Sequence, residues 1–243
     1  MTNRFDFGRL LRVAAMATIV PLAALGLWQS AANAEGVLPV VTPAPAVDAT
    51  EAGSEAVAVF AGGCFWGVQG VFQHVKGVKM AVSGYAGGTL ANPTYEDVLT
   101  EQTGHAEAVK VTYDPAQVSY GQLLRIFFSV ITDPTTLNRQ GNDVGLSYRS
   151  ALFYMNNAQK AAAEAYIAQL DAAMIYPGKI VTEVTAYSNF FDAEDYHQDN
   201  AYTKQVNPIY LAHFDQPKID DMQKFYPDLW LDRPVLVFAA NYS

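Results

Sequence analysis

Apolar positions along the chain follow two periods, which predict strands and helices in turn. Residues 56–60 (Ala-Val-Ala-Val-Phe) form a short apolar run that ends at Gly62-Gly63, as expected of a buried strand entering a tight turn. From Phe65 to Val75 the apolar residues recur at helical spacing, every three or four positions. The pattern therefore predicts a strand, a glycine turn and a helix in immediate succession.

The same periods predict the elements that follow. Asn157 is the expected N-cap of a long alanine-rich helix, because Asn followed by Ala, Gln, Lys and Glu is typical of a helix start. Strands and helices do not alternate strictly, which favours an α+β fold over a doubly wound parallel sheet. Strands are predicted at 79–84, 108–113, 151–155 and 180–187, and helices at 118–131, 157–174, 193–204 and 219–225.

The amino-acid composition and net charge limit the kinds of partner that the chain can bind. Hydrophobic residues make up 51% of the 243 residues and charged residues only 16%, so the chain can bury a sizeable core. The net charge is −9, which argues against binding to nucleic acid or to an anionic membrane surface.

The first 34 residues have the pattern of a cleavable export signal. Basic residues precede an apolar stretch from Val13 to Trp28, and Ala32-Asn33-Ala34 is a small-residue cleavage site. The alternative is an uncleaved anchor, but the apolar stretch is shorter than the ~20 residues that a spanning helix needs. We expect Sec-type export to the periplasm with cleavage after Ala34, and no stable membrane insertion after processing.

Residues 35–54 carry prolines among Ala, Val, Thr and Glu, which predicts an extended linker or a disordered N-terminus of the mature chain. Residues 55–243 have a length that suits one folded domain. We expect this domain to be a monomer.

Cys64 is the only cysteine of the chain, so it has no partner for an intramolecular disulfide. A buried structural thiol is the ordinary interpretation of a lone cysteine. Here Gly62-Gly63 precede it, and the predicted helix begins directly after it. Helix N-termini favour the thiolate, which is the reactive form of cysteine. This position therefore predicts a nucleophile.

Eight sequence blocks, in order and spread over residues 57–230, resemble peptide methionine sulfoxide reductase A. A single block of this kind would be weak evidence, whereas eight in the order of the family make a chance match negligible. The blocks are Gly-Cys-Phe-Trp-Gly at 63–67, Ser-Gly-Tyr-Ala-Gly-Gly at 83–88, Asn-Pro-Thr-Tyr-Glu-Asp-Val at 92–98, Thr-Gly-His-Ala-Glu-Ala-Val at 103–109, Tyr-Asp-Pro at 113–115, Arg-Gln-Gly-Asn-Asp-Val-Gly at 139–145, Tyr-Arg-Ser at 148–150 and Tyr-His-Gln at 196–198.

The resemblance implies an enzyme that reduces the S epimer of methionine sulfoxide, free or in proteins, to methionine. It also implies a two-layer α/β sandwich built on a mixed sheet and related to the ferredoxin-like topology. No metal or other cofactor is implied, because thiols supply the electrons. Carried over to matching positions, the roles are Cys64 as nucleophile, Glu107 as acid, Tyr95 and Tyr148 as hydrogen-bond donors to the sulfoxide oxygen, Phe65 and Trp66 as the methyl pocket, and Asp143 as a substrate-binding residue.

The residue types suit this chemistry. The oxygen of a sulfoxide leaves poorly until it is protonated, so the acid must stay neutral near pH 7, and an apolar pocket raises the pKa of a Glu. Phenols donate hydrogen bonds without adding a charge. Aromatic rings also make favourable contacts with sulfur. Attack by Cys64 would leave a sulfenic acid on that residue.

Each assigned residue also has a structural interpretation that the sequence leaves open. Glu107 could be a solvated charge at a strand edge, and Asp143 could bond its own backbone in a turn. Tyr95 and Tyr148 belong to a set of 14 tyrosines, most of which are expected to be packing residues. Trp66 could serve only as a core anchor. The four histidines, which form no metal-binding pattern with the cysteine, are expected to be structural.

Three departures from the family pattern stand out. Leu146-Ser147 replaces Thr-Gln, and Gln69 replaces Glu, and both bear on substrate fit. The third departure is that residues 230–243 lack the resolving cysteine that many relatives carry. We therefore expect an external reductant: a thioredoxin-like or glutaredoxin-like domain, or a small thiol.

Other functional classes can be weighed on the same residues. His105-Ala106-Glu107 matches a fragment of the zinc deaminase signature, but that class needs further cysteines and is excluded. A cysteine hydrolase with His105 or His197 beside Cys64 stays open. So does a non-catalytic module that binds oxidised proteins through its aromatic pocket.

Overall fold

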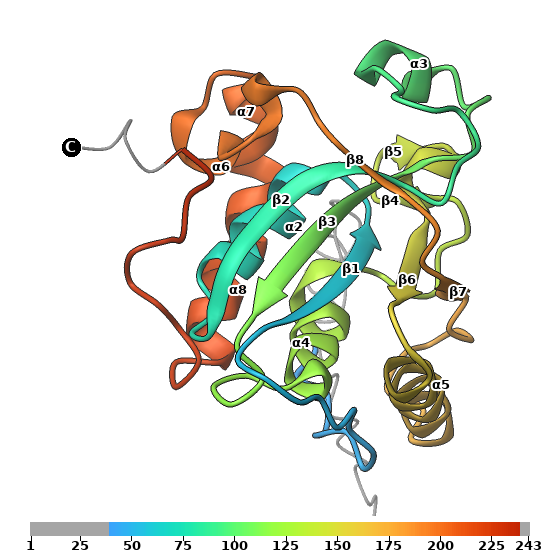
Figure 1. The fold of residues 1–243 in the computed structure, drawn as a ribbon, viewed down its shortest axis with the longest axis vertical. Coiled ribbons are helices and arrows are strands. Elements are labelled where there is room, and N and C mark those ends of the chain that lie inside the picture. Colours follow the sequence, from blue (N-terminus) through green and yellow to red (C-terminus); the bar gives the residue numbers. More distant parts are fainter. Residues whose placement is uncertain (1–38, 239–243) are drawn as a thin grey trace, which may run out of the picture. The chain divides into compact units, whose positions relative to one another are not determined.

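The computed structural model describes residues 39–238 and is built on a six-stranded sheet (Figure 1). The strands lie in the order β7-β6-β1-β3-β2-β8, and every neighbouring pair is antiparallel except β6 and β7, which are parallel. The sheet is therefore mixed, as predicted. Its strands are β1 (Ala56–Gly62), β2 (Val78–Ala86), β3 (Ala106–Tyr113), β6 (Ser150–Tyr154), β7 (Glu183–Ala186) and β8 (Phe190–Asp192).

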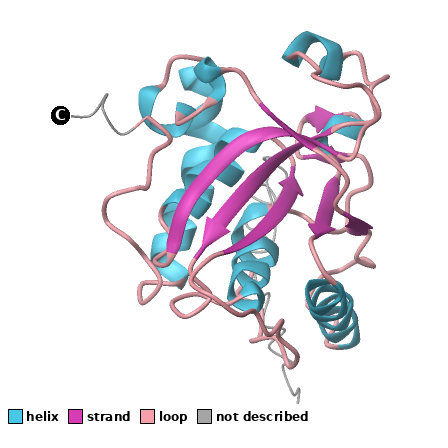
Figure 2. Ribbon diagram, in the orientation of Figure 1, coloured by secondary structure: helices cyan, strands magenta, loops and turns pink. Residues whose placement is uncertain are grey.

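Helices cover one face of this sheet, which makes the α+β fold two-layered (Figure 2). The longer helices are α2 (Phe65–Gln73), α4 (Tyr120–Ile126), α5 (Asn157–Ala172) and α8 (Gln216–Phe225). The shorter elements are α3 (Tyr95–Leu99), α6 (Asn200–Thr203), α7 (Pro208–Tyr210), the π-helical turns η1 (Phe127–Ile131) and η4 (Leu211–Asp215), the 3-10 turns η2 (Leu146–Tyr148) and η3 (Asp195–His197), and a small hairpin of β4 (Arg139–Gln140) and β5 (Asp143–Val144).

The main core lies between the sheet and these helices. Phe60 of β1 is fully buried, and its ring centroid lies 4.8 Å from that of Phe72 on α2 and 5.5 Å from that of Phe127. On β3, every second residue from Glu107 to Tyr113 shares this face, because side chains alternate along a strand. The alternation places Glu107 on the same face of the sheet as α2.

The opposite face of the sheet carries mainly alanines, together with Val59 and Phe153. Ala61, Ala106, Ala108 and Ala151 form a second, smaller cluster there, with Tyr187 and Phe190 packed against it. The connection from β7 to β8 therefore covers this face at close range, as its path across the sheet in Figure 1 shows.

The predicted elements are present, with differences at their ends. The long helix starts one residue earlier than predicted, with Asn156 rather than Asn157 as its N-cap, accepting from the Gln159 N–H at 2.9 Å. The helix predicted at 118–131 is α4 followed by a π-helical turn, and the one predicted at 193–204 is two short turns. Strand β8 and helix α3 were not predicted, because both are short and β8 depends on tertiary pairing.

Residues 39–54 belong to the segment predicted as an extended linker or a disordered N-terminus. They carry no helix or strand, yet they pack against the domain. Thr42 is fully buried and its hydroxyl is hydrogen-bonded to Ser129 and Tyr166. Further along, Asp48 accepts from the backbone N–H of Gly121 at 2.7 Å. The reason is that these polar side chains supply partners for buried donors of α4 and α5. Residues 35–38 and the predicted signal peptide lie outside the described residues.

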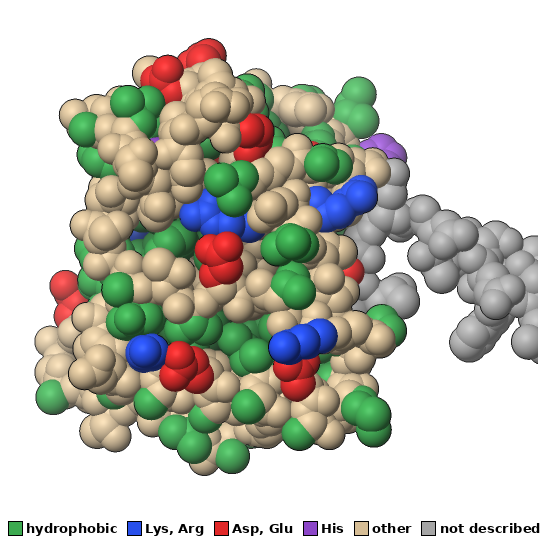
Figure 3. Space-filling model, turned by 90° about the vertical axis from the view of Figure 1, so that its right-hand side faces the viewer, with side chains coloured by type: hydrophobic (Ala, Val, Ile, Leu, Met, Phe, Trp, Pro, Cys, Tyr) green, Lys and Arg blue, Asp and Glu red, His purple; other side chains and the backbone are tan. Residues whose placement is uncertain are grey.

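Charged side chains of both signs are interspersed on the face shown in Figure 3. Arg149 is paired with Glu183 at 3.2 Å and Lys160 with Glu164 at 3.8 Å. Within residues 39–238, none of the helices combines the length and apolar character needed to cross a membrane.

Candidate active site

Cys64 occupies the turn between β1 and α2, where it is the N-cap residue of the helix. The preceding Gly63 has a φ of 90°, and a Cβ there would collide with the side chain of Gln140. This position therefore requires glycine both for its backbone conformation and for space. The strand, turn and helix lie as the sequence predicts, and Cys64 is 7% exposed.

Glu107 lies beside the first turn of α2. Its Oε2 accepts a 2.9 Å hydrogen bond from the backbone N–H of Phe65, one of the N–H groups that a helix start leaves unsatisfied. The side chain is 1% exposed. Burial raises the pKa of Glu107 to about 8, against the lowering effect of the Phe65 bond. A buried neutral acid is thus present, and the alternative of a solvated edge charge is wrong.

The expectation that the helix N-terminus favours the Cys64 thiolate is wrong for this resting site. Burial, followed by the carboxyls of Asp215 and Glu107, raises the pKa of the Cys64 thiol well above its usual range, although the Trp66 N–H acts in the opposite direction. The physical reason is first that burial disfavours the charged thiolate, and then that two carboxyls add negative charge near the sulfur. One of them, Glu107, also takes the Phe65 N–H at the positive end of α2.

Tyr95 reaches the site from the start of α3. Thr94 caps this helix in a capping box with Asp97, and the Tyr95 N–H donates to Glu194 at 2.8 Å. Burial first, and then the Glu107 charge, raises the pKa of Tyr95 above its usual value. The Tyr95 hydroxyl therefore stays protonated over the whole physiological pH range.

Tyr148 enters at the end of η2, opposite Tyr95. Its pKa is raised for the same two reasons, burial and then Glu107. The turn is held by Glu101, whose carboxylate accepts from the backbone N–H of Ser147 at 2.9 Å and from its hydroxyl at 2.6 Å. Ser147, one of the departures from the family pattern, thus fastens the turn that presents Tyr148.

Phe65 and Trp66 form an aromatic wall with a histidine. Phe65 is fully buried, and Trp66 is 6% exposed. The Trp66 Nε1–H donates to His197 Nδ1 at 3.0 Å, and the His197 ring centroid lies 4.4 Å from that of Tyr95. Burial lowers the pKa of His197 to about 4, so the ring is neutral. His197 is structural, as expected, and it braces two predicted site residues.

Asp143 lies on β5, and its Oδ2 accepts a hydrogen bond from the Tyr210 hydroxyl. Its side chain thus has a partner far away in the sequence, beyond any local turn. The Tyr210 ring also meets the edge of Trp66 at 5.9 Å between centroids. Sequence reasoning missed Tyr210. Its only local signal is the Asn207-Pro208 helix start, in which Asn207 caps α7.

Gln69 of α2, the second departure from the family pattern, uses both ends of its amide in hydrogen bonds. Its amide nitrogen donates to the Ala81 carbonyl and to Gln198, and its oxygen accepts from the Asp199 N–H at 2.9 Å. This side chain therefore ties α2 to the segment that contains His197.

All seven predicted residues gather around the N-terminus of α2. Glu107 influences the pKa of Cys64, Tyr95 and Tyr148 alike, which places the four groups within electrostatic reach of one another. Within residues 39–238 no group of three or more His, Cys, Asp or Glu side chains could hold a metal ion. The arrangement offers one thiol, one neutral acid and two neutral phenols at one aromatic wall.

The family model for peptide methionine sulfoxide reductase matches residues 56–228, which includes all of these groups. The chain belongs to the peptide methionine sulfoxide reductase family. A peptide methionine sulfoxide reductase from Mesorhizobium japonicum is 52% identical over 189 residues, which cover 78% of this chain and 96% of the relative.

Solved structures of the family agree with this membership. The reduced form of Mxr1 from Saccharomyces cerevisiae has a TM-score of 0.58 and 29% identity, covering 67% of this chain and 91% of that one. Methionine sulfoxide reductase A of Corynebacterium diphtheriae has a TM-score of 0.55 and 34% identity, covering 72% and 87%. The chain is therefore a peptide methionine sulfoxide reductase with a single cysteine.

Proposed function

We propose that this reductase acts on the S epimer of methionine sulfoxide, with Cys64 as nucleophile and Glu107 as acid. The observation that carries the proposal is the buried Glu107 carboxyl. Its raised pKa keeps it neutral, and its hydrogen bond from the N–H of Phe65, the residue after Cys64, holds it close to the cysteine. Tyr95 and Tyr148, kept neutral by burial, would donate hydrogen bonds to the sulfoxide oxygen.

The first half of the cycle balances within these groups. The Cys64 sulfur attacks the sulfoxide sulfur while Glu107 protonates the oxygen, so that the sulfur–oxygen bond of the substrate can break. Methionine leaves as the reduced thioether. Cys64 takes the hydroxyl as a sulfenic acid, with the proton that Glu107 gave, and the proton lost by the Cys64 thiol restores Glu107 to its neutral form.

The second half of the cycle needs two external thiols. The first condenses with the Cys64 sulfenic acid to a mixed disulfide and releases water, and the second displaces Cys64 as thiol. The support for this step is that Cys64 is the only cysteine in the chain. A thioredoxin-like or glutaredoxin-like domain, or a small thiol, fits this requirement.

We further propose that the enzyme repairs oxidised proteins in the periplasm. The support is the export signal read from residues 1–34, with its Ala32-Asn33-Ala34 cleavage site. Expression of the full chain followed by cell fractionation and N-terminal sequencing tests this. A cytoplasmic product that begins at Met1 would contradict it.

The hydrolase alternative loses support from the histidines. His197 Nδ1 is occupied by Trp66 and its pKa is lowered to about 4, which makes it a poor base for Cys64. His105 accepts the Gly88 N–H through Nδ1 and contacts the Leu90 carbonyl through Nε2. Both nitrogens of His105 and Nδ1 of His197 are therefore engaged in structural contacts, while the low pKa of His197 disfavours its remaining nitrogen as a base.

Separated epimers of methionine sulfoxide in a peptide, with dithiothreitol as reductant, test the main proposal. The wild type should reduce the S epimer only, and Cys64→Ser should have no activity. Turnover of the R epimer alone, or equal turnover in the variant, would overturn it. If the module only binds oxidised peptides, binding persists in Cys64→Ser and the wild type shows no reduction.

A further inference from the structure

Asp215 is a buried acid to which the mechanism above gives no role. It ends η4 and is completely buried, and neither of its carboxylate oxygens has a hydrogen-bond partner. The Lys218 ammonium lies 3.5 Å from Oδ1, on the next turn of the helix. A buried carboxylate with one ion pair and no hydrogen bond is costly, so its presence here calls for an explanation.

The Asp215 carboxylate packs closely against the first turn of α2, the helix that Cys64 caps. A Cβ at Gly67, one turn after the cysteine, would collide with Asp215 Oδ1. Only a glycine at this position lets the acid approach the first turn of α2. The site thus has an acid on each side of the helix start: Glu107 from the sheet and Asp215 from the C-terminal segment.

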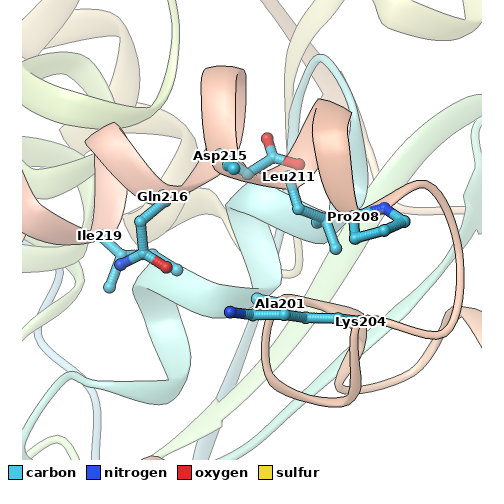
Figure 4. A pocket seen from close by; sticks show the side chains of 8 residues that line it. Ala201, Lys204, Pro208, Leu211, Asp215, Gln216 and Ile219 are labelled. Atoms are coloured by element: carbon cyan, nitrogen blue, oxygen red, sulfur yellow. The ribbon is translucent and has the colours of Figure 1, made fainter.

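On its far side, Asp215 borders a pocket of about 100 Å³ between α6, α7 and α8 (Figure 4). Lys204, Leu211 and Ile219 also line it. This space holds a few water molecules at most, which is too small for a substrate peptide. Lys204 shares this pocket with Asp215, whereas the ion pair of Asp215 is with Lys218.

At the alkaline pH where Cys64 loses its proton, the charges acting on it do not balance: Glu107 of β3 and Asp215 of η4 are both ionised, whereas Lys218 of α8 supplies one positive charge. The neutral Tyr210 hydroxyl of α7 also lies within electrostatic reach of Cys64, and Asp143 of β5 acts on both carboxyls. Burial raises the pKa of Asp215 to about 6, so this acid is largely ionised at neutral pH. A negative charge in a buried setting disfavours a second one nearby far more than it would in water.

We propose that Asp215 acts on Cys64 through its negative charge. It keeps Cys64 in the thiol form while no substrate is bound, and the positive charge of Lys218 acts in the opposite direction. This inference rests on the proposed role of Cys64. Hydrogen peroxide reacts with the thiolate, which takes one oxygen as sulfenic acid while the O–O bond breaks and hydroxide leaves. Glu107 activates a sulfoxide by protonation. Keeping Cys64 as the thiol in the absence of substrate therefore favours its reaction with sulfoxide over its reaction with peroxide.

Alkylation of the full chain by iodoacetamide as a function of pH tests the proposal, because Cys64 is the only thiol. Asp215→Asn should move the alkylation midpoint to lower pH and speed alkylation at pH 7 by about tenfold, for a shift of one pH unit. Lys218→Gln should move the midpoint the other way. Asp220→Asn is the matched control on α8, because Asp220 is exposed and bonded to Gln216; it should leave the midpoint unchanged.

The opposite shifts of the alkylation midpoint expected for Asp215→Asn and Lys218→Gln distinguish an effect of charge from an effect of altered structure. A merely structural role would shift both variants in the same direction, or shift neither, and either result overturns the proposal. Lys218 is at the edge of the core, so its variant keeps the test decisive if Asp215→Asn does not fold. Inactivation by hydrogen peroxide at pH 7 should be faster in Asp215→Asn by a similar factor. Alkylation needs no turnover, so it stays readable even if the epimer assay refutes the reductase mechanism.

Discussion

The backbone N–H of Phe65 donates a 2.9 Å hydrogen bond to Oε2 of Glu107, across 42 positions of sequence. This bond joins the first residue of α2 to strand β3, and it fixes the acid directly beside Cys64. One carboxylate oxygen is held by the helix, which leaves the other side of the carboxyl for a substrate.

Glu107→Gln should lower kcat/KM for the S sulfoxide by ~10² to 10⁴-fold, the usual size of general acid catalysis. The pKa of about 8 means that the wild-type acid is protonated below that pH and loses its proton above it. The wild-type pH profile should therefore show a falling limb near pH 8, and that limb should be missing in Glu107→Gln. An unchanged falling limb in the variant would assign it to another group.

Stability should also depend on Glu107. Its folded pKa of about 8 lies above the ordinary 4.5, so the stability it contributes is fully present below about pH 4.5 and is lost as pH rises through 8. The loss is on the order of 5 kcal/mol over this window. Urea unfolding at a series of pH values should show a flatter profile for Glu107→Gln than for the wild type. Parallel profiles for the two proteins would mean that the raised pKa is absent in solution.

Tyr95→Phe and Tyr148→Phe should each lower kcat by about ten- to a hundredfold, because a hydrogen bond to a group that gains charge is worth roughly 1.5–3 kcal/mol. The double variant should lose less than the product of the two effects if both phenols serve one oxygen. Steady-state kinetics on the S sulfoxide provide the measurement. Tyr187→Phe, on the other face of the sheet, is the control.

Tyr210→Phe should raise KM more than it lowers kcat. The variant loses the hydrogen bond to Asp143 but keeps the ring against Trp66. Asp143→Asn keeps a side chain that can accept from Tyr210, so it should be the milder change. Equal KM values in the wild type and Tyr210→Phe would remove Tyr210 from substrate binding.

Phe60→Ala should cost about 3–5 kcal/mol of folding free energy, because the ring is fully buried between Phe72 and Phe127. Met174→Ala is the matched control, because that side chain is 83% exposed. Chemical unfolding measures both. A loss below about 1 kcal/mol for Phe60→Ala would mean that the core is packed differently.

Periodicity alone placed the strand, the glycine turn and the helix around Cys64, because apolar spacing and glycine act locally. The resemblance of sequence blocks named the seven site residues, and the structure brings them together. The sequence could not reveal β8, since it exists only through pairing with β2. For α3 the one local signal is the Thr94–Asp97 capping box, because the helix is a short turn without an apolar stripe. Nor could the sequence reveal that residues 39–54 pack against the domain, because their composition is that of a linker.

By itself, the sequence determined that Cys64 has no cysteine partner in the chain, and for this reason the proposed mechanism takes its electrons from an external thiol. Only the tertiary structure decided the state of that thiol at rest. The pKa of Cys64 depends on burial and on Asp215 and Glu107, which lie 151 and 43 positions away in the chain. The local sequence predicts the positive electrostatic potential at the start of α2. The carboxyls that oppose this potential are brought beside Cys64 only by the tertiary structure.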